Sequence, residues 1–137
     1  MKKLLSTNYS AGAFNTAMLL LRMISGLLIM MNHGYDKLIH FSDKQHDFTN
    51  FMGIGSTASL ALVVFAEFFC GLFIAIGLFT RLATVPLIVT MCVVIFKVNH
   101  GNVFTPDLEK APLFLAAFLT ILIVGPGKVS VDGMTGK

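Results

Sequence analysis

Four apolar stretches occupy most of this 137-residue chain and restrict it to one kind of fold. With short extensions they cover residues 14–33, 58–79, 82–99 and 106–124, each close to the ~20 residues with which an α-helix crosses a bilayer. The chain is 55% hydrophobic and only 12% charged, far more apolar than a soluble domain. We therefore predict one all-α integral membrane domain over residues 1–137, a bundle of four transmembrane helices.

Local signals set the expected helix ends. Thr105 and Pro106 suit the N-cap and first position of the fourth helix, and Gly125-Pro126-Gly127 ends it. The turn between the second and third spans is very short, which predicts antiparallel neighbours. Between the first two spans, Ser42 and Gln45 have the spacing of a capping box, so we expect a short interfacial amphipathic helix there.

The loop charges predict the orientation in the membrane. Four spans place both termini on one side, and polar residues 6–10 together with the lack of a small-residue cleavage site lead us to expect that the first apolar run is retained. The side of the termini carries one more Lys or Arg than the other, so the positive-inside rule predicts cytoplasmic termini. The two sets are Lys2, Lys3, Arg81, Lys128 and Lys137 against Lys37, Lys44, Lys97 and Lys110.

Two opposite charges, Arg22 and Glu67, lie inside apolar runs, where a charge is expensive unless it is paired or used. At ~100° per residue, Arg22 shares one face of the first helix with Gly26, His33 and Lys37. Glu67 shares a face of the second helix with Gly71, and the two glycines would let the backbones approach closely. Two interpretations stay open: a buried ion pair between Arg22 and Glu67 that fixes helix register, or a ligand or proton site.

A polar mouth is expected at the outer side, where His33, Lys37, Asn99 and His100 gather. Histidine shuttles protons and lysine holds anions, although lysine at a helix end also commonly extends to the interface for purely structural reasons. The histidines lack an HxH or HExxH pattern, so no metal site is predicted.

The two cysteines, Cys70 and Cys92, fall at similar depth in adjacent helices, and whether they meet is left open. Without a CxxC pair they do not indicate a thioredoxin-like mechanism. At the inner end, Gly77 and Arg81 lie near the short turn. The tail after the fourth helix is expected to form a capped structural turn, with Gly125, Gly127, Ser130 and Asp132 in it.

Several motifs follow one another from about Ala17 to Asp132: Arg22-x-x-x-Gly26, His33-Gly34-x-x-Lys37, Glu67-x-x-x-Gly71, Gly77-Leu78-Phe79-Thr80-Arg81, Asn99-His100-Gly101 and Gly125-Pro126-Gly127-x-x-Ser130-x-Asp132. Their order and spacing resemble the DoxX family of small bacterial membrane proteins. The resemblance implies a compact four-helix bundle in the bacterial cytoplasmic (inner) membrane. It also implies an association with redox systems, including quinone-linked thiosulfate oxidation and oxidative-stress functions.

The sequence contains no flavin, haem or redox-active cysteine domain, so catalysis would require a partner subunit or a bound quinone, and no catalytic residue is assigned. The leading hypothesis is a membrane subunit or anchor of a redox system, which the resemblance implies is quinone-linked, with a buried polar site or proton path at Arg22, Glu67 and His33. Two alternatives stay open: a small-solute carrier or channel-forming homo-oligomer, and a purely structural scaffold. The expected partners are the lipid bilayer and a redox subunit, with no nucleic acid.

Overall fold

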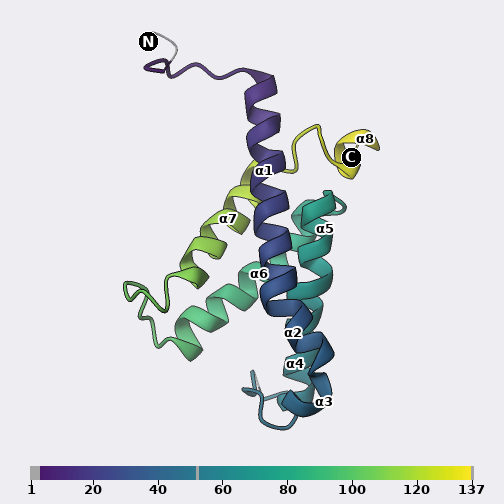
Figure 1. Ribbon diagram of the computed structural model, residues 1–137, viewed down its shortest axis with the longest axis vertical. Helices are drawn as coiled ribbons and strands as arrows, with labels where there is room; N and C mark the ends of the chain where they lie inside the picture. Colours follow the sequence, from purple (N-terminus) through teal and green to yellow (C-terminus); the bar gives the residue numbers. More distant parts are fainter. Residues whose placement is uncertain (1–3, 52, 137) are drawn as a thin grey trace.

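The computed structural model describes residues 4–51 and 53–136, which form helices and connecting loops with no strand among them (Figure 1). The first helical run is continuous and consists of α1 (Ala11–Ile29), the π-helical η1 (Met30–Gly34) and α2 (Tyr35–Ile39). The second consists of α4 (Ser56–Val64), the π-helical η2 (Phe65–Cys70) and α5 (Gly71–Ile76). The remaining elements are α3 (Phe41–Lys44), α6 (Thr80–Val93), the π-helical η3 (Val94–Val98), α7 (Lys110–Val124) and α8 (Val131–Met134).

Three of these runs are long and apolar enough to cross a membrane: Ala11–Ile39, Ser56–Ile76 and Thr80–Val98. They confirm the all-helical membrane class. At 15 residues, α7 extends only ~22 Å, less than the ~30 Å of a typical hydrocarbon core. The fourth span therefore stays a prediction.

The expected start of the fourth helix at Thr105 and Pro106 is wrong. The Leu108 amide donates to the Thr105 carbonyl at 3.0 Å, so this segment forms a turn, and α7 begins only at Lys110. The expected interfacial helix is shortened in the same way. Its one turn, α3, contains Ser42 inside it rather than at its cap, and the Gln45 side chain donates to the Ser42 carbonyl.

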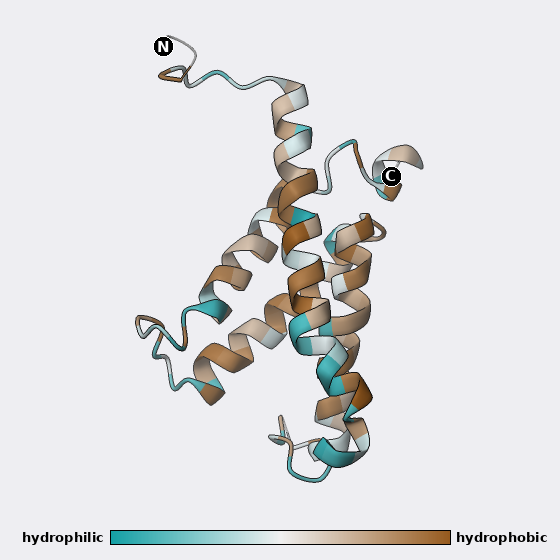
Figure 2. Cartoon of the chain, in the orientation of Figure 1, coloured by the Kyte–Doolittle hydropathy of each residue, from teal (hydrophilic) through white to brown (hydrophobic). Residues whose placement is uncertain are grey.

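The two ends of the bundle differ in what they hold (Figure 1). At one end, here called the termini end, lie the start of α1, the α5–α6 turn and residues 125–136. At the other, the loop end, lie residues 40–51, 53–55 and 99–109. The long α1–α2 run packs against α5 and η2, while α6 packs against α7. Hydrophobic residues cover most of the long helices, and a hydrophilic band interrupts α1 within its apolar part (Figure 2).

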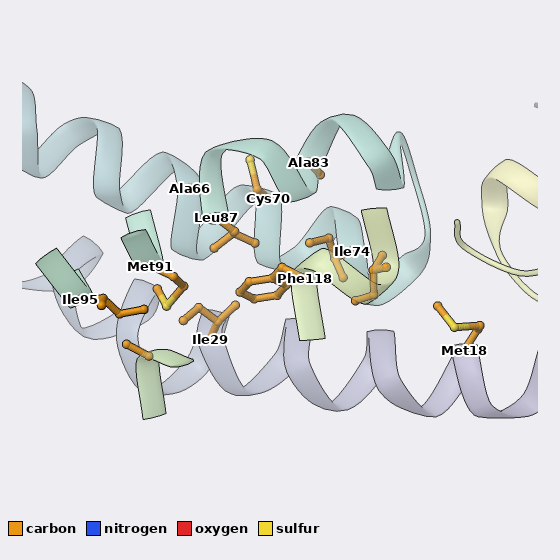
Figure 3. Packing of buried hydrophobic residues seen from close by; sticks show 12 residues of the cluster. Met18, Ile29, Ala66, Cys70, Ile74, Ala83, Leu87, Met91, Ile95 and Phe118 are labelled. Carbon is orange, nitrogen blue, oxygen red and sulfur yellow. The ribbon is translucent and has the colours of Figure 1, made fainter. Parts of the chain in front are cut away.

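The core is built around Phe118, which α7 inserts between α1 and α6 (Figure 3). Phe118 and its neighbours Ile29, Ile74 and Leu87 are each at most 1% exposed. A side chain of this kind contributes roughly 1.5–3 kcal/mol when it leaves water. In a membrane, where lipid is as apolar as the core, close packing takes over much of that role.

Two glycines bring α1 against α5. A Cβ on Gly26 would lie 2.6 Å from the Gly71 carbonyl oxygen, and a Cβ on Gly71 would lie 3.1 Å from the Gly26 oxygen. No larger residue fits at Gly26 without moving backbone. This contact fixes the height at which the polar residues of the two helices face each other.

Candidate functional site

The π-helical turns η1 and η2 pack on each other through Gly34. A Cβ at Gly34 would lie 2.5 Å from the Phe68 nitrogen and 2.7 Å from the Glu67 carbonyl carbon. The contact is therefore backbone to backbone, and it places the side chains that follow Gly34 beside those of η2. Short π-helical turns inside α-helices occur frequently at functional sites.

A buried ion pair links the two runs next to this contact. Lys37 Nζ donates to Glu67 Oε2 at 2.6 Å, with 4% of the Glu67 side chain and 20% of the Lys37 side chain exposed. A carboxylate at this depth requires a partner, since an unpaired charge in lipid costs several kcal/mol. The interpretation that pairs Glu67 with Arg22 is therefore wrong, because Lys37 occupies the carboxylate and the Arg22 guanidinium bonds backbone carbonyls instead.

A cavity of about 300 Å³ adjoins this pair and is here called the polar chamber. Its polar lining comes from α1–α2, η2 and the 99–110 connection: His33, Lys37, Glu67, Asn99, Asp107 and Lys110. The half-buried His33 ring meets Phe114 of α7 edge to face, with 6.1 Å between ring centroids. The chamber thus combines an imidazole, a buried carboxylate and two ammonium groups, which can donate hydrogen bonds and exchange protons.

An apolar groove of about 470 Å³ lies on the other side of the same ion pair, between α4 and α6. Lys37 and Glu67 line both the groove and the polar chamber. The rest of the groove is largely aliphatic and aromatic, including Val63, Val89 and Val93, and Phe48 and Phe51 cover its loop end with their rings in edge-to-face contact. The two charges therefore sit where a polar space meets an apolar one.

The other two residues predicted to form the polar mouth, Asn99 and His100, do not both line the polar chamber. Asn99 lines the polar chamber, whereas His100 is exposed, has a φ of 51° and is absent from the chamber wall. Asp107 and Lys110 line the chamber but were not predicted. Lys110 could have been found in the sequence, because it is a charged residue directly beside the fourth apolar run. Asp107 could not, because it lies in a turn, and hydrophobic periodicity does not predict where a turn places its side chains.

The Arg22 side chain lies away from this site, at the termini end. Its Nη1 donates to the carbonyls of Ile74 and Ala75 at 3.1 and 3.3 Å, and its Nη2 donates to the Val129 carbonyl at 2.5 Å. The side chain is completely buried, and its Nε has no hydrogen-bond partner among residues 4–51 and 53–136. Arg22 thus caps the C-terminus of α5, where a positive charge also complements the helix dipole.

Asp132 caps the helix that starts across the same turn. Its Oδ1 accepts from the Phe79 amide at 2.9 Å, and its Oδ2 accepts from the Thr80 amide and hydroxyl, both at 2.8 Å. The Asp132 amide in turn donates to the Gly77 carbonyl at 2.8 Å. A carboxylate at the start of α6 satisfies otherwise unpaired N–H groups.

The other tail residues hold this arrangement. Gly77 has a φ of 77°, and a Cβ there would collide with Nη1 of Arg22 and Cβ of Ser130. The Ser130 hydroxyl donates to the Gly127 carbonyl at 2.7 Å and accepts from the Gly133 amide at 2.9 Å. Arg81 donates to the Ile123 carbonyl at 3.3 Å and lies against Gly125. The chemistry of this termini-end cluster, Arg22, Gly77, Thr80, Ser130 and Asp132, is that of helix capping.

The thiols and carboxylates form no further centre in the described part of the chain. Cys70 and Cys92 are both free, and Cys70 is buried. Among residues 4–51 and 53–136, no group of three His, Cys, Asp or Glu side chains is placed to hold a metal ion.

The apolar helical runs, the glycine-mediated contacts and the enclosed ion pair define a small polytopic helical membrane protein. The sequence model of the DoxX family matches residues 17–100, more than half of the chain, and the protein belongs to that family. No curated protein matches it. No solved structure matches it either. The matched region contains Arg22, the chamber residues from the first three runs and the α5–α6 turn.

Proposed function

We propose that the chain is a membrane subunit of a redox system and that it binds a quinone beside the Lys37–Glu67 pair. The observation that carries the proposal is the position of this pair, which lines both the polar chamber and the apolar groove. A quinone has the matching shape, a ring with two hydrogen-bond acceptors attached to a long apolar tail. Membership of the DoxX family, with its association with redox systems, supports the same class of ligand.

The chamber residues have the chemistry that such a ring requires. Lys37 Nζ and the His33 ring can donate to ring oxygens, and His33 and Glu67 can hold the protons that accompany electron transfer. The bound quinone would supply the two-electron chemistry, with electrons from a partner subunit. The groove would take the tail, since Val63, Val89 and Val93 offer it only apolar surface.

Arg22 is not part of this proposal. Three of its hydrogen bonds go to backbone carbonyls at the termini end, where the guanidinium replaces helix caps. The proton-active groups are instead His33 and Glu67, with Lys37 holding the carboxylate in place. We further propose the bacterial inner membrane as the location, with the loop end on the outer side and both termini in the cytoplasm.

The test measures quinone in the protein purified from its native membrane in lipid nanodiscs, by solvent extraction and mass spectrometry. We expect about one quinone per chain in the wild type and strong loss in Val89→Phe, which fills the groove. Leu82→Phe is the matched control, because Leu82 is an exposed residue of the same helix outside the groove. Glu67→Gln is compared with Glu109→Gln, an exposed glutamate outside the chamber.

Wild-type protein that carries ordinary lipid and no quinone contradicts the proposal and favours the carrier or scaffold alternatives. Equal loss of quinone in Val89→Phe and Leu82→Phe also contradicts it, because the groove would then not be the binding site. Size-exclusion profiles show whether each variant keeps its fold, so that quinone content is compared only between folded proteins.

A further inference from the structure

A second groove, of about 790 Å³, runs between α1 and α7 and is separate from the groove between α4 and α6. Its walls are apolar, with Leu20, Ile24 and Leu28 from α1 facing Leu113 and Ala117 from α7. Its polar groups are Asn32, His33 and Lys110 toward the loop end and Ser25 deeper in. The groove therefore has the polarity of a single lipid, with one polar end and an apolar length.

The charge at the polar end is positive. Among the described residues that line the groove, Lys110 alone carries a full charge, and none has a carboxylate. Lys110 is exposed and forms no ion pair with any of residues 4–51 and 53–136. An anionic group placed here meets an available ammonium, with the Asn32 amide and the His33 ring as further hydrogen-bond donors.

The groove is long enough to hold the hydrocarbon of one leaflet. From Leu20 to His33 the helix rises ~20 Å, and one leaflet contributes ~15 Å of hydrocarbon. An acyl chain with its headgroup at Lys110 would therefore run along α1 toward the middle of the membrane. The level of Lys110, at the first residue of α7, suits a headgroup at the membrane surface.

We infer that the α1–α7 groove is a binding site for a phospholipid with an anionic headgroup, held at Lys110. A second copy of this chain fits less well, because a two-fold interface through this groove would bring two Lys110 side chains toward each other. The inference stands on its own observations, although the two sites share His33 and Lys110 at the polar chamber: the quinone tail would lie in the groove between α4 and α6, whereas the lipid lies along α1 and α7.

The test is native mass spectrometry of the protein reconstituted with equal amounts of phosphatidylglycerol and phosphatidylcholine. We expect wild-type protein to retain phosphatidylglycerol about fivefold over phosphatidylcholine, the factor that one lysine near a membrane surface contributes. Lys110→Gln removes this preference, whereas Lys97→Gln, at an exposed lysine outside the groove, keeps it.

A second pair of variants tests the groove itself. Ala117→Phe narrows the groove and reduces the retained lipid of either kind, while Ala116→Phe, one position away and outside the groove, does not. Equal retention of the two lipids by the wild type overturns the inference, as does loss of the preference in Lys97→Gln. A lipid-free dimer that Ala117→Phe converts to monomer would assign the groove to a second copy instead.

Discussion

Lys37 Nζ lies 2.6 Å from Glu67 Oε2 and joins α2 to the π-helical turn η2 where the interior would otherwise hold an unpaired charge. The carboxylate is almost completely enclosed, while the lysine keeps a fifth of its side chain exposed. The pair therefore connects the loop end of the bundle to its interior. It also gives the helices a fixed register at the polar chamber.

Removing either partner of this pair should destabilise the protein. Lys37→Met leaves Glu67 buried without its cation, and breaking one side of a buried pair costs roughly 3–5 kcal/mol in soluble proteins. The double variant Lys37→Met/Glu67→Gln should lose less than the sum of the single variants, because no uncompensated charge stays behind. Thermal unfolding in detergent measures both effects.

The control for this cycle is Lys97→Met, since Lys97 is exposed and lies within the π-helical segment η3. If the double variant loses as much stability as the two single variants together, Lys37 and Glu67 are not energetically coupled and the prediction is wrong. A loss as large in Lys97→Met would show that any lysine at this level matters, and not the ion pair.

Gly34→Ala should disturb the site without changing any charge. The added methyl meets the backbone of Glu67 and Phe68, so η1 and η2 must separate. We expect a loss of stability of about 1–3 kcal/mol, as for overpacking elsewhere. Gly12→Ala is the matched control, because among the described residues its methyl would meet only Ser10 Oγ, at 4.0 Å. A Gly34→Ala protein as stable as Gly12→Ala would mean that the two turns are not in contact.

Asp132→Ala should loosen the α5–α6 turn. The amides of Phe79 and Thr80 lose the Asp132 carboxylate as acceptor, and a buried donor left unpaired, here the Thr80 amide, costs about 1–3 kcal/mol. Hydrogen exchange at these amides should accelerate, while Asp47→Ala, at an exposed loop position, should leave it unchanged. Unchanged protection of the Thr80 amide in Asp132→Ala would show that another group caps α6.

Arg22→Lys should release the tail although it keeps the charge. The planar guanidinium bonds α5 and the residue 129 carbonyl at once, which the single ammonium of lysine cannot reproduce. We expect faster tryptic cleavage after Lys128 in this variant. Arg81→Lys is the control, since Arg81 is exposed and makes a single side-chain hydrogen bond to the described residues, to the Ile123 carbonyl. Equal cleavage rates in the two variants would contradict a clamp at Arg22.

The fourth span can be tested with reporters fused at each terminus. The Lys128 amide donates to Asn15 Oδ1 at 2.8 Å, so the chain returns after α7 to the end where α1 begins. We therefore expect both reporters to report the same side, and the cytoplasm if the lysine and arginine count decides orientation. Reporters on opposite sides would mean that α7 does not cross the membrane.

Much of the helical architecture could be predicted, because length and hydropathy alone locate the runs that contain Arg22 and Glu67. Their partners could not. The ~100° periodicity assumes a regular α-helix, whereas η1 and η2 are π-helical and shift the faces of the residues beyond them. The site was also completed by groups outside any periodic segment. Asp107 comes from a turn and Val129 from a tail that folds back, and neither leaves a periodic signal in the sequence.

Two residues cap the helices at the α5–α6 turn, Arg22 at the end of α5 and Asp132 at the start of α6. This arrangement has a consequence for biosynthesis. Arg22 and the amides of Phe79 and Thr80 are synthesised long before the Val129 carbonyl and the Asp132 carboxylate that they bind. Until residues 129–132 have left the ribosome, the hairpin has polar groups without their native partners. Closure of the bundle therefore waits for the segment that contains Val129 and Asp132, and a nascent chain stalled before residue 129 should still present an open hairpin to chaperones and proteases.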